Sequence, residues 1–365
     1  MCSWRPNYFL QTGENSNYND EYLNNCLEIG NELDSRNLPV IFSLKHLSEI
    51  VDVPFNFLNQ LVSREITPYR SFTIRKQGGR YRNIVAPNDN LLKVLRFIHQ
   101  QILSKLNYHS SSKAYYKGSK IYDNAFTHCG SNWLIKLDIT RFFESISEKQ
   151  VYYTFRELGY PPRFCYELAK ITTIVALSKR YNYKRWRNGS IRIGYLPQGY
   201  PTSPLLANRV CNKLDNELYE YARQNKYIYT RYSDDIVFSA VNCSRGKAVT
   251  DLKNINAILV SFGFSQNYRK THIVPPGARK IITGLVVNGS TPTIKKDVKN
   301  RIRAQLFYIN KYGIADVCRQ LGFKSIIGYR NHLKGLINFV ISIDKNIGSK
   351  YSIEFNRLLK REKIY

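Results

Sequence analysis

Residues 227–240, with the sequence YIYTRYSDDIVFSA, decide how the rest of the chain is interpreted. Two runs of β-branched and aromatic residues, 227–232 and 236–240, flank Ser233, Asp234 and Asp235. The segment therefore predicts a β-hairpin with two acids in its turn. Because an Asp side chain readily bonds the local backbone in turns, a structural turn is the simplest explanation of the pair when it is taken alone.

A second acid ends a predicted strand elsewhere in the chain. The apolar segment 133–139 reads as a short strand that ends at Asp138. If this strand and the hairpin are neighbours in one sheet, the three carboxylates meet at its edge. Such a cluster suits two Mg²⁺ ions about 4 Å apart, with Mn²⁺ as the alternative ion, because hard cations prefer oxygen ligands. Since consecutive strand residues point to opposite faces, we expect Asp234 to be the closer bridging ligand.

The charge of the chain indicates its class of partner. Lys and Arg total 55 against 27 Asp and Glu, which gives a formal net charge of +28. A field of this sign attracts polyanions, and neutralised phosphates release counterions, so nucleic acid is the favoured partner. The 28 Tyr and 18 Phe residues suit stacking on unpaired bases. The alternative is a basic protein that gains only solubility from its charge.

Several classes of protein are disfavoured. No apolar run approaches the roughly 20 residues that span a bilayer, and the first residues do not resemble a signal peptide, so we expect a cytoplasmic protein without a membrane partner. The seven Cys residues contain no CxxC pair, and the six His residues show no HExxH spacing. Zinc sites and disulfide frameworks need tighter or paired spacing.

Local patterns predict an α+β protein. The first 35 or so residues are rich in Asn, Glu and Asp and show little periodicity, so an N-terminal arm that is partly disordered is expected. A hairpin is predicted over 69–85, with a Gly-rich turn and a basic rim. Further strands are predicted near 271–274 and 281–287. Helices are predicted over two short segments within 38–64, over 91–106, 151–177, 203–226 and about 245–262, and beyond Thr293.

Three stretches together resemble a known family. They are LDITRFFESI at 137–146, LPQGYPTSP at 196–204 and RYSDDIVFS at 231–239. In this order and spacing they resemble motifs A, B and C of the reverse transcriptases, and the likeness extends from about residue 69 into the C-terminal third. It implies a right-hand polymerase fold. The implied division is an arm at 1–37, fingers with N-terminal helices at 38–130, a palm with part of the fingers at 131–290, and a helical thumb at 291–365.

The resemblance assigns roles at the reaction centre. Asp138, Asp234 and Asp235 match the catalytic carboxylates of the family, with the backbone carbonyl of Ile139 as a further metal ligand. Phe143 matches the steric gate, where an aromatic ring would clash with a ribose 2′ hydroxyl, so dNTP rather than rNTP is the expected substrate. Without the motif, Phe143 would be a plain core aromatic residue.

The resemblance also assigns nucleotide contacts. Gln198 and Gly199 match the loop that lines the nucleotide pocket, where a small residue lets the backbone approach the sugar. Lys76 and Arg82 match the triphosphate clamp of the fingers hairpin, although basic residues on such a rim would otherwise be a solvated face. Lys270 matches a lysine near the leaving pyrophosphate, where a proton donor helps.

Two short segments resemble retron reverse transcriptases in particular. DNAFTH at 123–128 is similar to their Asn-Ala-x-x-His signature, and ITGLVV at 282–287 is similar to their Val-Thr-Gly segment. This implies a cognate structured noncoding RNA, priming from a 2′ hydroxyl of that RNA, a branched RNA–DNA product, and antiphage defence with an effector protein. Expected RNA contacts come from Asn124 and His128 and from the basic start of the C-terminal helices, Lys295, Lys296, Lys299, Arg301 and Arg303.

Other functions stay open on sequence grounds. One is a reverse transcriptase of another bacterial kind: diversity-generating, abortive-infection or CRISPR-associated. A second is a catalytically silent polymerase fold that binds RNA as a scaffold, which the intact carboxylates and the Gln198–Gly199 loop disfavour. A third is a plain basic RNA-binding protein with chance motifs.

Overall fold

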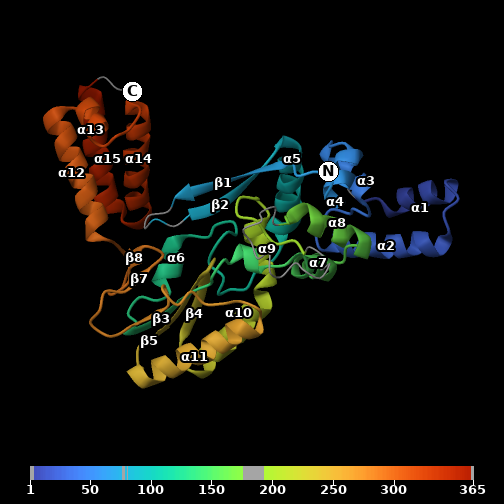
Figure 1. The fold of residues 1–365 in the computed structure, drawn as a ribbon, viewed down its shortest axis with the longest axis horizontal. Coiled ribbons are helices and arrows are strands. Elements are labelled where there is room, and N and C mark those ends of the chain that lie inside the picture. Colours follow the sequence, from blue (N-terminus) through green and yellow to red (C-terminus); the bar gives the residue numbers. More distant parts are fainter. Residues whose placement is uncertain (1–3, 76–78, 80, 176–192, 363–365) are drawn as a thin grey trace, which may run out of the picture.

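The computed structural model describes residues 4–75, 79, 81–175 and 193–362 (Figure 1). Its N-terminal part is helical, in contrast to the partly disordered arm expected from the sequence. Asn19 caps the second helix by accepting a hydrogen bond from the amide of Glu21, and Trp4 packs closely against Gly30. Helix α2 buries Leu23, Cys26, Gly30 and Leu33 at helical spacing, and the many Asn, Glu and Asp residues between them mask this pattern in the sequence. The helices are α1 (Pro6–Asn15), α2 (Asp20–Ser35), α3 (Leu44–Val51) and α4 (Phe55–Val62).

The predicted hairpin is confirmed as β1 (Tyr69–Arg75) and β2 (Tyr81–Pro87). In Figure 1 it extends from α5 toward the C-terminal helices. The helix predicted over 91–106 begins as α5 (Asp89–Phe97) and then changes to a π turn, Ile98–Ile102, and a 3₁₀ turn, Leu103–Lys105.

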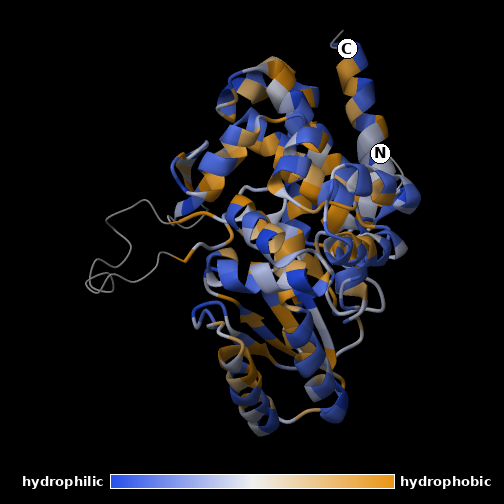
Figure 2. Ribbon diagram, turned by 90° about the vertical axis from the view of Figure 1, so that its right-hand side faces the viewer, coloured by the Kyte–Doolittle hydropathy of each residue, from blue (hydrophilic) through white to orange (hydrophobic). Residues whose placement is uncertain are grey.

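A four-stranded antiparallel sheet lies at the centre, in the order β4-β5-β3-β6. The sequence prediction that the strand ending at Asp138 lies beside the acidic hairpin is confirmed, since β3 pairs with β5. Figure 2 shows hydrophobic residues interspersed with hydrophilic ones in the sheet region. Their bounds are β3 (Trp133–Asp138), β4 (Ile228–Tyr232), β5 (Asp235–Ala240) and β6 (His272–Val274).

Helices cover one face of this sheet. Ile135 and Leu137 of β3 and Phe238 of β5 join the same buried core as Leu218 of α10 and Ile255 of α11. The single helix predicted over 203–226 is two helices that meet at Cys211, α9 (Ser203–Val210) and α10 (Asn212–Gln224). The other helices of this part are α6 (Ile121–Phe126), a 3₁₀ turn η3 (Phe143–Ser145), α7 (Glu148–Glu157), α8 (Pro162–Thr172) and α11 (Arg245–Ser261).

The C-terminal part is a helical bundle on a small sheet. Strands β7 (Ile281–Ile282), β8 (Leu285–Val286) and β9 (Thr293–Ile294) form that sheet. A second buried core joins the bundle to Leu134 and Val237, which lie on the face of the central sheet opposite to α10 and α11. The bundle helices are α12 (Lys296–Tyr312), α13 (Ile314–Gln320), α14 (Ile326–Ile343) and α15 (Lys345–Arg361). None of the described helices is long and apolar enough to cross a bilayer.

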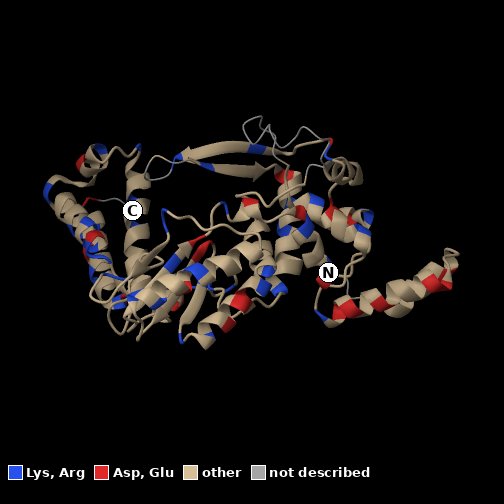
Figure 3. Ribbon diagram, turned by 60° about the horizontal axis from the view of Figure 1, so that its bottom comes forward, with Lys and Arg blue, Asp and Glu red and all other residues tan. Residues whose placement is uncertain are grey.

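Charge is distributed unevenly along the chain. The first 37 residues hold six acidic and two basic residues, although the whole chain has a formal net charge of +28. Figure 3 shows the acidic residues along α1 and α2, which project from the body, and basic residues along α12. The excess of positive charge therefore belongs to the part of the chain that follows the acidic helices α1 and α2.

Candidate active site

The three carboxylates converge because of the strand register. Asp138, the last residue of β3, is the direct partner of Asp235, the first residue of β5. Directly opposed residues share one face of a sheet, so both carboxylates lie on the same side. Asp234 precedes Asp235 in the tight turn after β4, and its carbonyl accepts a hydrogen bond of 2.9 Å from the amide of Ile139. Two sequence-distant segments are thus joined at one point.

The three acids differ in their electrostatic surroundings. Burial, and next the charge of Asp138, raises the pKa of Asp234. Burial, and next the charge of Asp234, raises the pKa of Asp235. Asp138 has partners: the Lys270 ammonium forms an ion pair with it, and the Asn267 amide donates a 3.0 Å hydrogen bond. The negative charges of Asp234 and Asp235 repel each other at partly buried positions, so a bound cation would stabilise them.

The donor set fits a hard divalent cation. It consists of carboxylate oxygens, with the backbone of Ile139 beside them, and such ligands suit Mg²⁺. Among the described residues, no three His, Cys, Asp or Glu side chains lie close enough together to hold a metal ion as they stand. Lys270 supplies the positive charge beside Asp138 in this structure. Burial acts to lower the pKa of Lys270, but the hydrogen bond to Asp138 outweighs it, so the pKa is raised.

A buried charge pair supports the turn from below. The guanidinium of Arg231 donates to both carboxylate oxygens of Asp215, at 2.8 and 2.6 Å, and both side chains are fully buried. It also donates to the Ser233 carbonyl at 3.2 Å and to the Asn208 side chain at 3.1 Å. Tyr229 donates to Asp215 at 2.6 Å. Helices α9 and α10 are thereby tied to the backbone of the acidic turn.

The sequence analysis did not single out this pair. A signal was present, since Arg231 is a charged residue within an apolar strand next to the acidic turn. Asp215 likewise stands beside the apolar face of its helix. Charges at buried positions are rarely tolerated without a partner, so each of them implied the other.

The predicted nucleotide-pocket residues also lie close together. The side-chain amide of Gln198 donates to the Glu144 carboxylate at 3.3 Å, and the backbone carbonyl of Gln198 accepts from the Val85 backbone amide at 2.8 Å. Gly199 has φ +121°, and a Cβ there would lie 2.4 Å from the Val85 carbonyl oxygen. Phe143 is half-buried beside Phe142, with a ring-centroid separation of 5.4 Å. Glycine is therefore required where the loop meets β2.

The remaining predicted contacts lie at the periphery. Arg82 is exposed on β2 opposite Ile74, whereas Lys76 lies outside the described residues. Lys296, Arg301 and Arg303 are exposed at the start of α12, and Lys295 and Lys299 are partly exposed. All five remain available to a polyanion.

The direct RNA contact expected of Asn124 and His128 is wrong for this structure, because both side chains are buried. The two ring nitrogens of His128 lie 2.7 Å from the hydroxyl oxygens of Ser239 and Thr230. These residues belong to β5 and β4, so His128 bridges the two strands that carry the acidic turn. A short motif identifies such a residue but does not show whether it faces solvent or the core.

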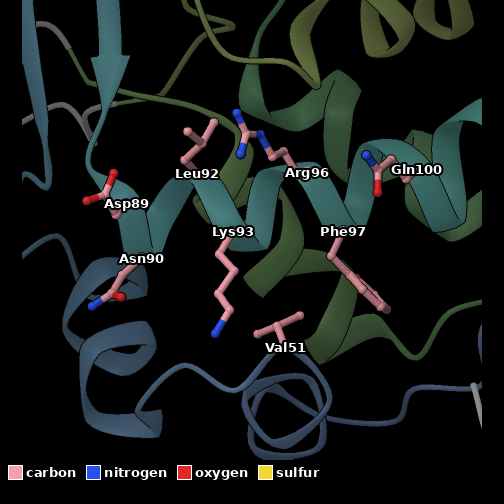
Figure 4. Close-up of a pocket in the computed structure, with 8 residues that line it drawn as sticks. All are labelled: Val51, Asp89, Asn90, Leu92, Lys93, Arg96, Phe97 and Gln100. Carbon is pink, nitrogen blue, oxygen red and sulfur yellow. The ribbon is translucent and has the colours of Figure 1, made fainter.

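Two hollows lie away from the carboxylates. One of about 610 Å³ is shown in Figure 4, where all lining residues except Val51 belong to α5 and the π turn that follows. The other, about 1290 Å³, is lined by Trp4, Phe9, Phe42 and their neighbours. Neither shares a lining residue with the acidic site.

Comparison with known proteins agrees with this geometry. The family model for reverse transcriptase (RNA-dependent DNA polymerase) matches residues 74–305. Retron Ec86 reverse transcriptase of Escherichia coli is 30% identical over 343 residues, covering 93% of this chain and 95% of that protein. Retron Mx162 reverse transcriptase of Myxococcus xanthus is 27% identical over 257 residues, covering 66% of this chain and 52% of that protein.

Similarity to solved structures is more distant. A telomerase from Candida albicans gives a TM-score of 0.45 at 13% identity, covering 80% of this chain and 56% of that chain. The foamy viral protease-reverse transcriptase gives a TM-score of 0.41 at 12% identity, covering 81% of this chain and 43% of that chain.

The chain belongs to the reverse transcriptase family and is an RNA-directed DNA polymerase with the right-hand fold. Its match along nearly all of the Escherichia coli protein identifies it, within that family, as a retron-type reverse transcriptase.

Proposed function

We propose that Asp138, Asp234 and Asp235 are the catalytic carboxylates with which this enzyme copies RNA into DNA from dNTPs. The observation that carries the proposal is the register of β3 and β5, which places Asp138 opposite Asp235 with Asp234 in the adjoining turn. The raised pKa of Asp234 and Asp235, caused first by burial, is typical of groups that are held together for function rather than for stability.

The carboxylates and the Ile139 carbonyl would hold two Mg²⁺ ions, with Mn²⁺ as the alternative. When bound, such ions activate a 3′ hydroxyl and neutralise charge on the triphosphate. In this proposal Lys270 gives a proton to the departing pyrophosphate, and its ion pair with Asp138 supports a place beside the carboxylates. These roles belong to groups at the same end of β3 and β5.

The surrounding residues select and hold the nucleotide in this proposal. Phe143 excludes a ribose 2′ hydroxyl, and the Gln198–Gly199 loop lines the pocket where it contacts β2. Lys76 and Arg82 bind the triphosphate from the hairpin. Arg82 is exposed there, as such a contact requires.

The retron-specific part of the proposal rests on the relatives. The enzyme would recognise a structured noncoding RNA, prime from a 2′ hydroxyl of it, and produce a branched RNA–DNA molecule. It would act in the cytoplasm in antiphage defence, with an effector protein. The division into arm, fingers, palm and thumb at residues 37, 130 and 290 belongs to the same proposal. Identity of 30% along 93% of the chain supports this assignment.

The first test is dNTP incorporation with Mg²⁺ on a primed RNA template by wild type and by Asp234→Ala/Asp235→Ala. Incorporation that disappears in a folded double variant supports the proposed carboxylates. Incorporation that persists in the double variant contradicts them. If wild type is inactive even with its cognate noncoding RNA added, the protein acts as a scaffold.

The second test is sequencing of RNA-linked DNA from cells that carry the native locus. A branch at a 2′ hydroxyl supports the retron reaction. DNA without linked RNA would instead indicate another kind of bacterial reverse transcriptase.

A further inference from the structure

Residues 111–115 form a short segment that runs beside β4, next to the acidic turn. The Arg231 amide donates to the Ser111 carbonyl, and the Lys113 amide donates to the Arg231 carbonyl, each at 2.8 Å. The side chain of Asn208 donates to the Ala114 carbonyl at 2.8 Å. The segment thus reaches the acidic turn in a backbone position fixed on both sides.

Tyr115, at the end of this segment, contacts two parts of the proposed active site. Its hydroxyl donates a 2.6 Å hydrogen bond to the Ser233 Oγ in the acidic turn. Its ring lies against Phe143, with centroids 6.4 Å apart and planes inclined by 44°. Tyr115 is 38% exposed, so these contacts leave part of the residue open to solvent.

The backbone here is strained, which indicates that the position of the ring matters. Tyr115 has φ +74° and Ser233 has φ +62°, both in the left-handed region that costs a non-glycine residue energy. Strain of this kind persists only where surrounding contacts determine the conformation, and it clusters at functional sites. The hydrogen bonds of the segment and the turn supply those contacts.

The contact with Phe143 matters because a steric gate must not move. Phe143 begins the single 3₁₀ turn η3, which gives little rigidity by itself. The ring of Phe143 has two aromatic neighbours, Phe142 at a centroid separation of 5.4 Å and Tyr115 at 6.4 Å. Contacts with two neighbouring rings restrict the rotation of Phe143 that would admit a 2′ hydroxyl.

We propose that Tyr115 is a positioning residue of the nucleotide pocket, whose ring holds the Phe143 gate and whose hydroxyl holds the acidic turn. Two effects follow from the two contacts. Loss of the ring relaxes selection between dNTP and rNTP. Loss of the hydroxyl alone slows the reaction with both nucleotides equally. This inference rests on the proposed role of Phe143 as the gate.

The experiment measures kcat and kcat/KM for one dNTP and the matching rNTP on a primed RNA template. Tyr115→Ala is expected to lower the dNTP preference about three- to tenfold, the size of effect that an aromatic pair supports. Tyr115→Phe is expected to keep the preference and to lower kcat about three- to tenfold for both nucleotides, as for one hydrogen bond. Tyr116→Phe removes a hydroxyl from the adjoining residue without touching the Ser233 bond, so both quantities should stay at wild-type values.

Phe143→Ala separates this inference from the proposed function. If Phe143→Ala leaves the preference unchanged, the proposed gate itself fails. If Phe143→Ala relaxes the preference and a folded Tyr115→Ala does not, the inference about Tyr115 is overturned while the gate stands. Should Tyr115→Ala not fold, Tyr115→Leu, which keeps apolar volume without the ring, decides the same question. A changed preference in Tyr115→Phe would overturn the separation of the two roles.

Discussion

Arg231 and Asp215 are a pair of charges that solvent does not reach, directly beneath the acidic turn. Each charge satisfies the other, and Tyr229, Asn208 and the Ser233 carbonyl complete the hydrogen bonds. A pair of this kind adds little net stability compared with apolar residues, but removing one partner leaves a buried charge. Its effect is therefore to fix the geometry of the turn.

Asp215→Asn is expected to lower the free energy of unfolding by about 3–5 kcal/mol, because Arg231 then keeps an uncompensated charge in the core. Glu220→Gln is the matched control, since it breaks an exposed ion pair with Arg223 on the same helix. That change should cost about 1 kcal/mol or less. Equal losses for the two variants, measured by urea unfolding, would contradict the supporting role of the buried pair.

His128 gives the fold a sensitivity to acid. Burial, assisted by the charge of Lys113, lowers the pKa of His128 to about 3. Because the unfolded chain takes up the proton at a pKa near 6.5, the neutral histidine contributes stability above that pH. This contribution falls as pH decreases from about 6.5 toward 3, with a slope of at most about 1.4 kcal/mol per pH unit.

Between pH 6 and pH 5, wild type should therefore lose about 1 kcal/mol more unfolding free energy than His128→Gln. His332→Gln, which changes an exposed histidine of α14, serves as the control and should behave as wild type. Unfolding curves at the two pH values measure this difference. Parallel losses in wild type and His128→Gln would show that His128 is not the group responsible.

At the scale of elements, the hairpin β1–β2 and the loop 196–200 depend on a close backbone contact. Val85 of β2 and Gln198 share a 2.8 Å hydrogen bond, and the next residue, Gly199, leaves no room for a side chain. Gly199→Ala should lower the unfolding free energy by about 1–3 kcal/mol and reduce kcat/KM for dNTP, because the Cβ would meet a backbone carbonyl at a positive φ.

Gly246→Ala is the control for that substitution. Gly246 lies in the first turn of α11, where an added Cβ would have no neighbouring atom within 4 Å, so alanine there should be neutral or stabilising by up to about 1 kcal/mol. A Gly199→Ala variant with wild-type stability and activity would show that β2 and the loop can separate without consequence.

The basic start of α12 is the other element with a testable role. Lys296→Ala/Arg303→Ala should make RNA binding less dependent on salt. The slope of log K against log [salt] is negative, and its magnitude should decrease by about 1 to 2. Arg245→Ala/Lys253→Ala removes the same charge from exposed positions on α11, which covers the other face of the central sheet. That control should leave the slope at its wild-type value. A wild-type slope in Lys296→Ala/Arg303→Ala as well would mean that these α12 residues do not contact the RNA.

For the whole molecule, local patterns predicted most strands and helices, and the family motifs predicted which ends meet. The order of the motifs predicted that β3 and β5 are neighbours, and the pairing of these strands in the structure confirmed it. The break at Cys211 did not follow, because the apolar face of α9 and α10 continues across it. The burial of His128 could not be predicted either. Its partners, Ser239 and Thr230, are distant in the sequence, so nothing near His128 indicates that they meet.

The three carboxylates are proposed to form one polymerase site, whose partly buried like charges lower the stability of the folded protein. Asp234 and Asp235 are half-buried like charges whose pKa is raised by burial and by their acidic neighbours, whereas Asp138 is paired with Lys270. Neutralising Asp234 or Asp235 should therefore relieve repulsion without loss of an ion pair, whereas neutralising Asp138 also removes its ion pair with Lys270 and should bring no net gain in stability.

The most direct measurement compares Asp138→Asn, Asp234→Asn and Asp235→Asn for dNTP incorporation with Mg²⁺ and, without divalent ions, for Tm. We predict that each variant loses about a thousandfold or more in activity, and that Tm rises for Asp234→Asn and Asp235→Asn only. Near-wild-type activity in any one of the three, or an activity loss that merely follows a lowered Tm, would contradict a single catalytic site built from these residues.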